Sequence, residues 1–161
     1  MNLRKTQSAE SQQSKTINQK STFGHVGSAR PGDIFESRVE LSQRGQHRPQ
    51  RAGVCGSAQG GTESLVLAEQ YEDDEIHDDY FWYAGHGGRD QKTGHQISDQ
   101  DFNARNQALA RSQSTGQPVR VFRRLPDGRY RYEGLWRVAA QTLGPGRSGF
   151  EVYRFRLEPR R

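Results

Sequence analysis

The sequence contains very little cysteine and few apolar residues. Its 161 residues include a single cysteine, Cys55, so the chain cannot form an internal disulfide or a zinc site that needs a cysteine pair. Only 30% of the residues are hydrophobic, and the mean hydropathy is −1.06. No apolar run approaches the length of a membrane span or forms a leader at the amino terminus. The composition therefore predicts one domain with a modest core, in the reducing interior of a cell.

The spacings that hold metals or activate nucleophiles are also missing. The five histidines form no His-Glu-x-x-His pattern, and there is no Cys-x-x-Cys pair. Gly85, Gly87 and Gly88 are not followed by the Lys-Ser/Thr pair of a phosphate-binding loop, which favours a tight turn. We therefore expect no metal, no cofactor and no catalytic residue. The residues leave open one hydrolase arrangement, an acid and base pair made by Asp74 and His86.

The charge of the chain is strongly positive. A formal net charge of +5 and an isoelectric point near 9.7 favour a polyanionic partner, although charge alone does not separate such a protein from other basic proteins. Residues 1–22 are rich in Ser, Gln and Lys and contain almost no large apolar side chain, which predicts a disordered polar tail. From residue 23 short alternating segments are divided by Gly, Pro and Asn/Asp turns, so we place the folded domain at residues 23–161.

The alternating segments predict a fold rich in strands. We expect strands at residues 34–41, 54–55, 64–68, 80–83, 119–123, 129–138 and 150–157. The continuous apolar run at residues 64–68 indicates a strand that is buried on both faces. The predicted fold class is α+β, with a mostly antiparallel sheet that curls into a barrel.

One helix is expected in the second half of the chain. Ser98 is placed as its N-cap, with Asp101 three residues later in the position of a capping box, and Gly116 ends it. Its core-facing side chains are predicted to be Phe102, Ala108 and Leu109.

Residues 71–83 place a cluster of acids between aromatic side chains. Two short strands edged by Tyr71 and Tyr83 would hold a flat polar ring between them, with a carboxylate to accept hydrogen bonds from its edge. A nucleobase is such a ring. A carboxylate suits the exocyclic amine of cytosine and opposes the carbonyl of thymine. By themselves, however, these residues fit a solvated acidic loop between packed strands at least as well.

Three ordered motifs resemble the SRA (SET- and RING-associated) domain family. They are residues 47–56 (HRPQRAGVCG), residues 71–74 (YEDD) and residues 83–90 (YAGHGGRD), and the resemblance covers nearly the whole chain. It implies a barrel of the PUA-like type with helices packed outside. It also implies a protein that binds duplex DNA containing 5-methylcytosine, or a related 5-modified cytosine, and flips the modified base out of the duplex.

The resemblance also assigns roles to individual residues. The flipped cytosine would be sandwiched between Tyr71 and Tyr83, and Asp74 would accept a hydrogen bond from its exocyclic amine. We expect only Asp74, of the four consecutive acids at residues 72–75, to enter the pocket. Main-chain groups just before Tyr71 would add contacts, from Ala68, Glu69 and Gln70. Ala84 stands where the family often has threonine, which leaves room for a bulkier modification such as 5-hydroxymethyl.

Two loops would reach into the DNA grooves, where something must fill the gap that the flipped base leaves. The first holds Arg51 between Gln50 and Ala52, and the second spans residues 92–97 with His95 and Gln96. Further arginines would pair with phosphates, unless they only form a solvated strand face; these are Arg48, Arg89, Arg120, Arg123 and Arg124.

This interpretation predicts a monomeric binding module, not an enzyme, whose partner is double-stranded DNA with a modified cytosine. In the alternative, the chain is, or derives from, the recognition part of a modification-dependent restriction endonuclease, with the nuclease on another domain or chain. In both cases we expect an intracellular location, cytoplasmic or nucleoid in a bacterium and nuclear in a eukaryote.

Overall fold

The computed structural model describes residues 22–68 and 71–160. In chain order its elements are β1 (Ile34–Phe35), α2 (Arg38–Gln43), β2 (Val54–Ser57), β3 (Gly61–Leu67), β4 (Glu75–Ile76), β5 (Phe81–Ala84), α3 (Ala104–Thr115), β6 (Val119–Arg124), β7 (Tyr130–Pro145) and β8 (Glu151–Pro159). The predicted tail lies outside the described residues, except for Thr22.

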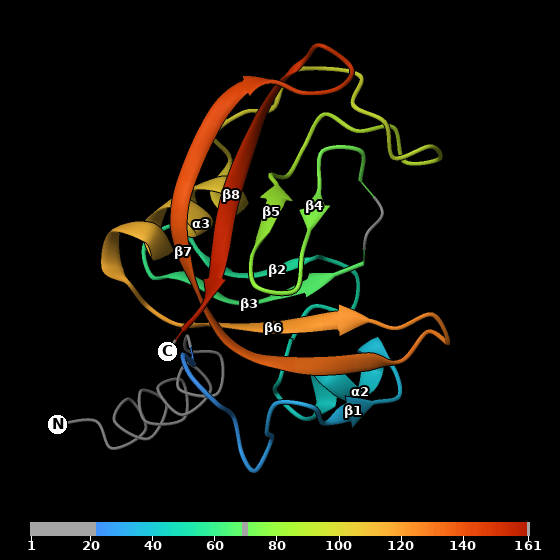
Figure 1. Cartoon of the computed structure of the whole chain (residues 1–161), viewed down its shortest axis with the longest axis vertical. Coiled ribbons are helices and arrows are strands. Elements are labelled where there is room, and N and C mark those ends of the chain that lie inside the picture. Colours follow the sequence, from blue (N-terminus) through green and yellow to red (C-terminus); the bar gives the residue numbers. More distant parts are fainter. Residues whose placement is uncertain (1–21, 69–70, 161) are drawn as a thin grey trace, which may run out of the picture.

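All strands belong to one strongly bent sheet, with the order β2-β3-β6-β7-β8-β5-β4 and with β1 paired to β7. Among the ladders between described strands, only the pairing of β3 with β6 is parallel. The long strand β7 pairs first with β6 and then with β8, and the register shifts between Val138 and Ala140. Such a bulge bends a strand, and Figure 1 shows β7 and β8 rising away from β2, β3 and β6. The predicted α+β class and mostly antiparallel sheet are confirmed, but the curled sheet does not close, because no described ladder joins β2 to β4.

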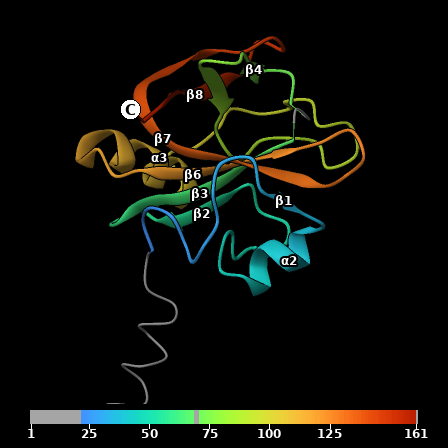
Figure 2. The same cartoon turned by 60° about the horizontal axis from the view of Figure 1, so that its bottom comes forward.

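Strand β3 separates two clusters of buried side chains. Successive residues of a strand point to opposite faces, so Leu65 and Leu67 join the larger cluster with Phe81, Val121 and Phe155. Val66 joins the smaller cluster, which includes Phe35, Leu41, Phe122 and Tyr132. Both faces of β3 are therefore buried, as its apolar run predicts. Figure 2 shows β6, β3 and β2 as neighbouring ribbons with α2 below them.

Residues 34–41 do not form the single strand that their alternating apolar side chains predict. The strand stops after Phe35, and Ser37 caps α2 by accepting a hydrogen bond from the N–H of Glu40 at 3.1 Å. Leu41 is fully buried, whereas Val39 is 45% exposed. In a short helix the two positions face different directions, and this explains why the period-two pattern was misleading.

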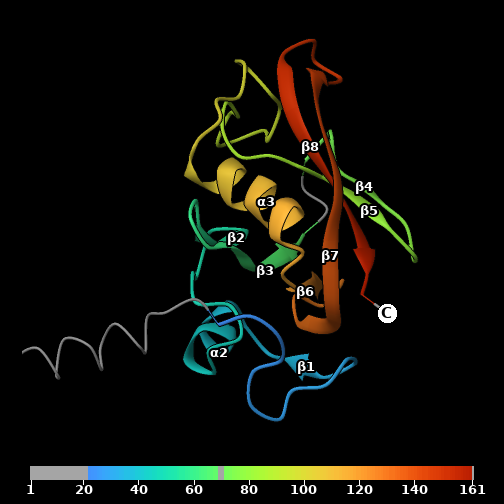
Figure 3. The same ribbon diagram turned by 90° about the vertical axis from the view of Figure 1, so that its left-hand side faces the viewer.

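The second helix begins later than the sequence predicts. Its N-cap is Asn103, whose side-chain oxygen accepts from the N–H of Asn106 at 3.0 Å, so the placement of Ser98 and Asp101 at this cap was wrong. Phe102 therefore precedes the helix and is 49% exposed. Ala108 and Leu109 are buried, and Gly116 ends the helix with φ of +72°, as predicted. Figure 3 shows α3 lying beside β7 and close to β2 and β3.

A group of charged side chains is buried beneath the amino-terminal segment. Glu63 is 1% exposed and accepts from Arg48 and from the N–H of Thr22, both at 2.6 Å. Arg120, also 1% exposed, donates to the main-chain oxygens of Gln46 and Gly24. The prediction that Arg120 contacts DNA phosphates is therefore wrong, because its guanidinium is enclosed and holds the chain together.

Candidate functional site

A cavity opens where β3 and β5 end. Fourteen residues line it: Arg38, Arg51, Gly53, Val54, Val66, Ala68, Tyr71, Asp74, Tyr83, Ala84, Gly85, His86, Arg89 and Arg105. The order of the strands brings these residues together. Tyr71 and Asp74 lie between β3 and β4, and β4 pairs with β5, which carries Tyr83 and Ala84. All four residues therefore line the same cavity. Glu69 and Gln70 lie outside the described residues.

Tyr83 forms one wall of this cavity and is fixed in place by its strand. It pairs with Phe155 of β8 and is 7% exposed. Burial, together with the nearby Asp74, raises the pKa of its hydroxyl above the usual range, so the ring is neutral. A Cβ atom at Gly53 would lie 2.5 Å from the Tyr83 hydroxyl oxygen. Only glycine therefore lets this backbone approach the ring so closely.

Asp74 is the acceptor of the cavity. One carboxylate oxygen, Oδ1, accepts from the main-chain N–H of Ala84 at 2.8 Å. Burial raises the pKa of the carboxyl to about 6, and this is the largest effect on it, partly offset by the Ala84 hydrogen bond and the charge of Arg89. At neutral pH Asp74 is therefore a partly desolvated carboxylate, which has a strong need for a hydrogen-bond donor.

The neighbouring acids have other partners. Glu72 accepts from the N–H of Gln96 at 3.0 Å and from the Ser148 hydroxyl at 2.7 Å, and Asp73 accepts from the N–H of Arg147 at 2.9 Å. These bonds tie the acidic segment to the loop before α3 and to the turn between β7 and β8. Glu75 lies in β4 and pairs with His77 and Arg154. Of the four acids, only Asp74 lines the cavity.

Tyr71 lies on the same cavity and carries a cation on its ring. The guanidinium carbon of Arg89 is 3.6 Å from the ring centroid, and its Nη2 donates to the main-chain oxygen of Gly85 at 2.7 Å. Such a stacked guanidinium is favourable on an aromatic face. Ala84, at the end of β5, is 1% exposed and presents only a methyl group to the cavity.

The predicted loop around Arg51 stands at the mouth of the cavity. Both of its ends are held, because His47 Nε2 lies 2.8 Å from the oxygen of Ala52, and Arg38 Nη2 donates to the oxygens of Pro49 and Ala52 at 2.8 and 2.6 Å. Gln50 and Arg51 at the tip are exposed. Sequence reasoning missed Arg38, because residues 34–41 were interpreted as a single strand and nothing in that pattern singled out this arginine.

The second predicted loop, residues 92–97, forms hydrogen bonds with other parts of the fold. Gln96 is 4% exposed and donates from Nε2 to the oxygens of Gly87 and Ser98 at 2.7 and 3.1 Å. Its amide supports the glycine turn, and its contact with DNA stays a prediction. The side chain of His95 is 65% exposed, with Nδ1 3.2 Å from a carboxylate oxygen of Glu72. It remains available at the surface.

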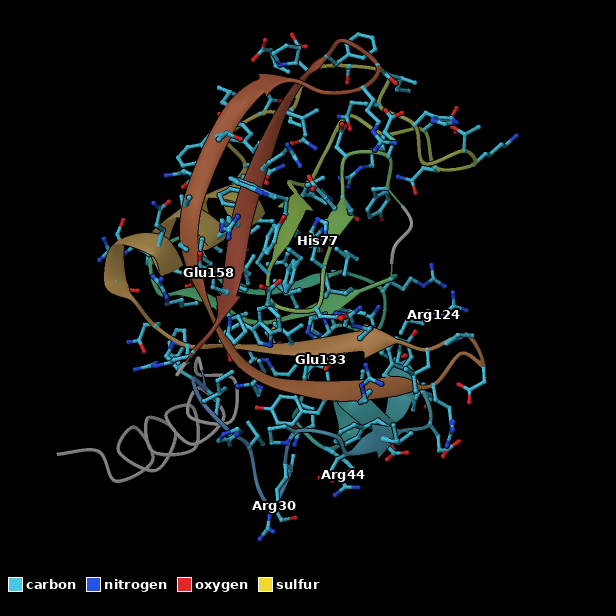
Figure 4. All side chains as sticks on the ribbon, in the orientation of Figure 1. Arg30, Arg44, His77, Arg124, Glu133 and Glu158 are labelled. Carbon is cyan, nitrogen blue, oxygen red and sulfur yellow. The ribbon has the colours of Figure 1, made fainter. Side chains whose placement is uncertain are left out.

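The predicted phosphate contacts do not gather in one place. Arg48 forms an ion pair with Glu63, and Arg123 with Glu133. Arg124 projects from the end of β6, away from the sheet (Figure 4). Only Arg51 and Arg89, of the arginines predicted to contact DNA, line the cavity, where they are joined by Arg38 and Arg105.

Residues 22–68 and 71–160 contain neither a cluster of metal ligands nor a helix suited to span a membrane. No three His, Cys, Asp or Glu side chains gather there as metal ligands. No helix over these residues is long and apolar enough to cross a membrane.

The comparisons with known proteins agree with this architecture. The profile of the SAD/SRA domain matches residues 22–161. The E3 ubiquitin-protein ligase UHRF1 of Rattus norvegicus is 35% identical over 84% of this chain, which spans about a fifth (21%) of that protein. The chain therefore belongs to the SAD/SRA domain family.

Solved structures of related proteins show the same fold. The SUVH5 SRA domain bound to fully hydroxymethylated CG DNA superposes with a TM-score of 0.76 and 31% identity, over 86% of this chain and 94% of that one. The modification-dependent TagI restriction endonuclease gives a TM-score of 0.81 and 36% identity, over 88% of this chain and 53% of that one.

Proposed function

We infer that this chain binds duplex DNA that contains 5-methylcytosine or a related 5-modified cytosine, and that the modified base enters the cavity between Tyr71 and Tyr83. The observation that carries the proposal is the arrangement of Asp74. Its Oδ1 accepts from the N–H of Ala84 at 2.8 Å, and the main chain of Tyr71 also hydrogen-bonds to the carboxyl group. Because a carboxylate has about four lone-pair sites, it can still accept from the exocyclic amine of cytosine. Thymine would bring a carbonyl oxygen to the same place and be rejected.

Entry of the base requires that it leave the duplex. Unstacking and unpairing cost a few kcal/mol, which two aromatic walls and the hydrogen bonds of Asp74 would offset. The anchored tip formed by Gln50 and Arg51 stands at the cavity mouth. We assign to it the contact with the gap in the duplex, because a loop held at both ends loses little conformational entropy on insertion. Main-chain groups of Ala68, Glu69 and Gln70 are proposed to complete the base contacts, and His95 to contact the duplex.

The first test compares affinities for matched duplexes. Burial of a methyl group contributes about 1 to 2 kcal/mol, so a duplex with one 5-methylcytosine should bind roughly five- to thirtyfold more tightly than its unmodified counterpart. Anisotropy titrations at fixed salt, with a third duplex that carries 5-hydroxymethylcytosine, measure both the preference and the room beside Ala84. Equal affinities for all three duplexes would contradict the proposal.

Aromatic variants provide the matched control for that test. Tyr71→Ala should lose roughly 1 to 3 kcal/mol of stacking, and with it most of the preference. Tyr80→Ala removes a tyrosine that stacks on His77 and Arg156 outside the cavity, and should retain the preference.

A second candidate is that the chain serves as the recognition part of a modification-dependent restriction endonuclease. The similarity to TagI, of which this chain covers 53%, supports it. In this case too the chain acts as a monomeric reader inside the cell, and cutting requires a nuclease on another domain or chain.

The purified chain should therefore bind modified plasmid without cutting it. Phosphodiester hydrolysis by metal ions needs clustered carboxylate or histidine ligands, and the acids beside the cavity are engaged in hydrogen bonds within the fold. Gel analysis of modified plasmid with magnesium or manganese checks this. Cleavage that disappears in both Asp74→Ala and His86→Ala would show instead that the chain is an enzyme.

A further inference from the structure

Three cationic or titratable side chains stand at the mouth of the cavity. His86 follows β5, Arg89 lies on the glycine turn, and Arg105 belongs to the first turn of α3, yet all three line the same cavity as Tyr71 and Asp74. Arg105 Nη1 lies 2.6 Å from His86 Nε2. These contacts join segments that are almost twenty residues apart in the chain.

The cluster around His86 has too many donors. Asn103 Oδ1 accepts from the N–H of Asn106, so its amide nitrogen must be the group that lies 3.2 Å from His86 Nδ1. Both ring nitrogens thus face a donor, Asn103 on one side and Arg105 on the other; the Asn103 amide also donates to the main-chain oxygen of His86 at 3.1 Å. A neutral imidazole has only one nitrogen that accepts, and a protonated imidazole has none. An acceptor-rich ligand would satisfy the donors that compete here.

The charge of the cluster is only partly balanced within the fold, by the nearby carboxylate of Asp74 acting on Arg89. Several arginines elsewhere in the described chain have carboxylate partners, as Arg48 has in Glu63 and Arg137 has in Glu158, whereas others, such as Arg111 and Arg120, donate to main-chain oxygens. No described carboxylate forms an ion pair with Arg89 or Arg105. Two unpaired guanidinium groups beside a histidine form a suitable site for an anion with several oxygens.

We propose that His86, Arg89 and Arg105 bind a backbone phosphate next to the nucleotide whose base enters the cavity, and that His86 takes up a proton when this phosphate binds. The proposal rests on the function inferred above, because the flipped nucleotide brings its own phosphates to the cavity mouth. It adds His86 and Arg105 to the DNA contacts and assigns them a ligand of one chemical class, a phosphodiester.

The direction of the proton linkage follows from the charges that face His86. Loss of hydration, and then the charges of Arg105 and Arg89, hold the pKa of His86 below its ordinary value. A phosphate would compensate these charges and raise the pKa, so binding takes up a proton and is favoured as the pH falls. Asp74 in the same cavity acts in the opposite direction, because protonation removes its acceptor charge. The contribution of His86 must therefore be measured as the ratio of the affinities of variant and parent for the modified duplex at each pH.

The phosphate contact is tested with Arg105→Gln and a neutral phosphate analogue. The variant should bind the modified duplex on the order of five- to tenfold more weakly, and the slope of log affinity against log salt should fall by about 0.9. Arg111→Gln, on the same helix but bonded to the oxygen of Gln59 away from the cavity, is the control and should change neither. In duplexes with a methylphosphonate on either side of the modified cytosine, one position should weaken binding by the parent more than binding by Arg105→Gln, because the variant has already lost one of the three phosphate contacts.

The proton linkage is tested with His86→Gln. Relative to the parent, this variant should bind the modified duplex within about twofold at pH 8 and roughly fivefold more weakly at pH 5.5. If the parent discriminates modified from unmodified duplex but the methylphosphonate effects are the same in parent and Arg105→Gln, the phosphate site is wrong. A ratio for His86→Gln that does not change with pH would overturn proton uptake at His86. A parent chain without discrimination would instead contradict the base cavity itself, so the two failures are distinguishable.

Discussion

Replacing Asp74 with asparagine should remove the preference for modified cytosine and shift it toward thymine. The hydrogen bond from Ala84 to Oδ1 at 2.8 Å requires an acceptor, so the new amide must keep its oxygen there and turn its NH₂ group into the cavity. Two donors would then face each other when cytosine enters. Since an unpaired buried donor costs about 1 to 3 kcal/mol, the affinity for 5-methylcytosine should fall roughly five- to 150-fold.

The same geometry predicts that Asp74→Asn prefers thymine over 5-methylcytosine, and this change of preference can be measured. Thymine opposite guanine presents a carbonyl to the new NH₂ group, and a mismatched base flips at lower cost. Competition titrations at pH 8 with 5-methylcytosine, cytosine and mismatched thymine in one sequence should therefore rank thymine first for Asp74→Asn and 5-methylcytosine first for the parent. An unchanged ranking would show that this carboxylate does not contact the base.

Loss of folding cannot account for that result, because the variant should be the more stable protein at pH 8. Burial raises the pKa of Asp74 from 3.8 to about 6. The carboxyl therefore contributes its stability below about pH 4 and loses it as the pH rises through about 6. Asparagine carries no charge at either pH. Thermal unfolding at pH 4 and pH 8 should show a gain for Asp74→Asn only at the higher pH.

Local sequence patterns predicted the sheet well, since most strands alternate or form an apolar run. Strands β2, β3, β5, β6 and β8 appear where expected, apart from their ends. The pattern failed at residues 34–41, where the cap made by Ser37 started a six-residue helix. A short helix that buries one side chain, Leu41, leaves almost no periodic signal. The error also hid Arg38, which supports the loop around Arg51.

The cavity shows a different limit of sequence reasoning. Tyr71, Asp74 and Tyr83 were expected together because the family resemblance connected motifs that no local rule connects. His86 and Arg105 are 19 residues apart, and nothing in their spacing indicates that β5 and α3 bring them to one place. The contact arises from tertiary structure, which a single sequence does not specify at this level.

The sequence alone also could not separate arginines that contact DNA from arginines that stabilise the fold. An arginine that binds a phosphate and an arginine that binds a carboxylate of its own fold look alike in a basic strand. Arg48 was expected on DNA, but its Nη2 lies 2.6 Å from Glu63, whose side chain is 1% exposed. Whether Arg48 binds a carboxylate or a phosphate depends on Glu63, a partner 15 residues away. The contribution of this ion pair to stability can be measured.

Replacing Glu63 with glutamine should destabilise the fold strongly. Glu63 accepts from Arg48 and from Thr22, and its charge also acts on the buried Arg120. The isosteric amide would leave these cations without compensation. Removing one member of a buried ion pair costs about 3 to 5 kcal/mol, which lowers the melting temperature by roughly 10 °C in a domain of this size. The control Glu158→Gln breaks the more exposed contacts with Arg137 and Arg156 and should cost less than about 1 kcal/mol.

The variant Arg48→Gln decides which role Arg48 plays. If Arg48 supports the fold, Arg48→Gln should lower the free energy of unfolding without changing the salt dependence of DNA binding. If Arg48 binds a phosphate, the slope of log affinity against log salt should instead fall by about 0.9 with stability unchanged. The short contact with an enclosed carboxylate favours the first outcome, because an arginine committed to Glu63 would have to leave an uncompensated buried charge in order to reach DNA. Thermal unfolding and salt titrations on the same preparations therefore separate a residue that holds the loop at the cavity mouth from one that contacts the duplex.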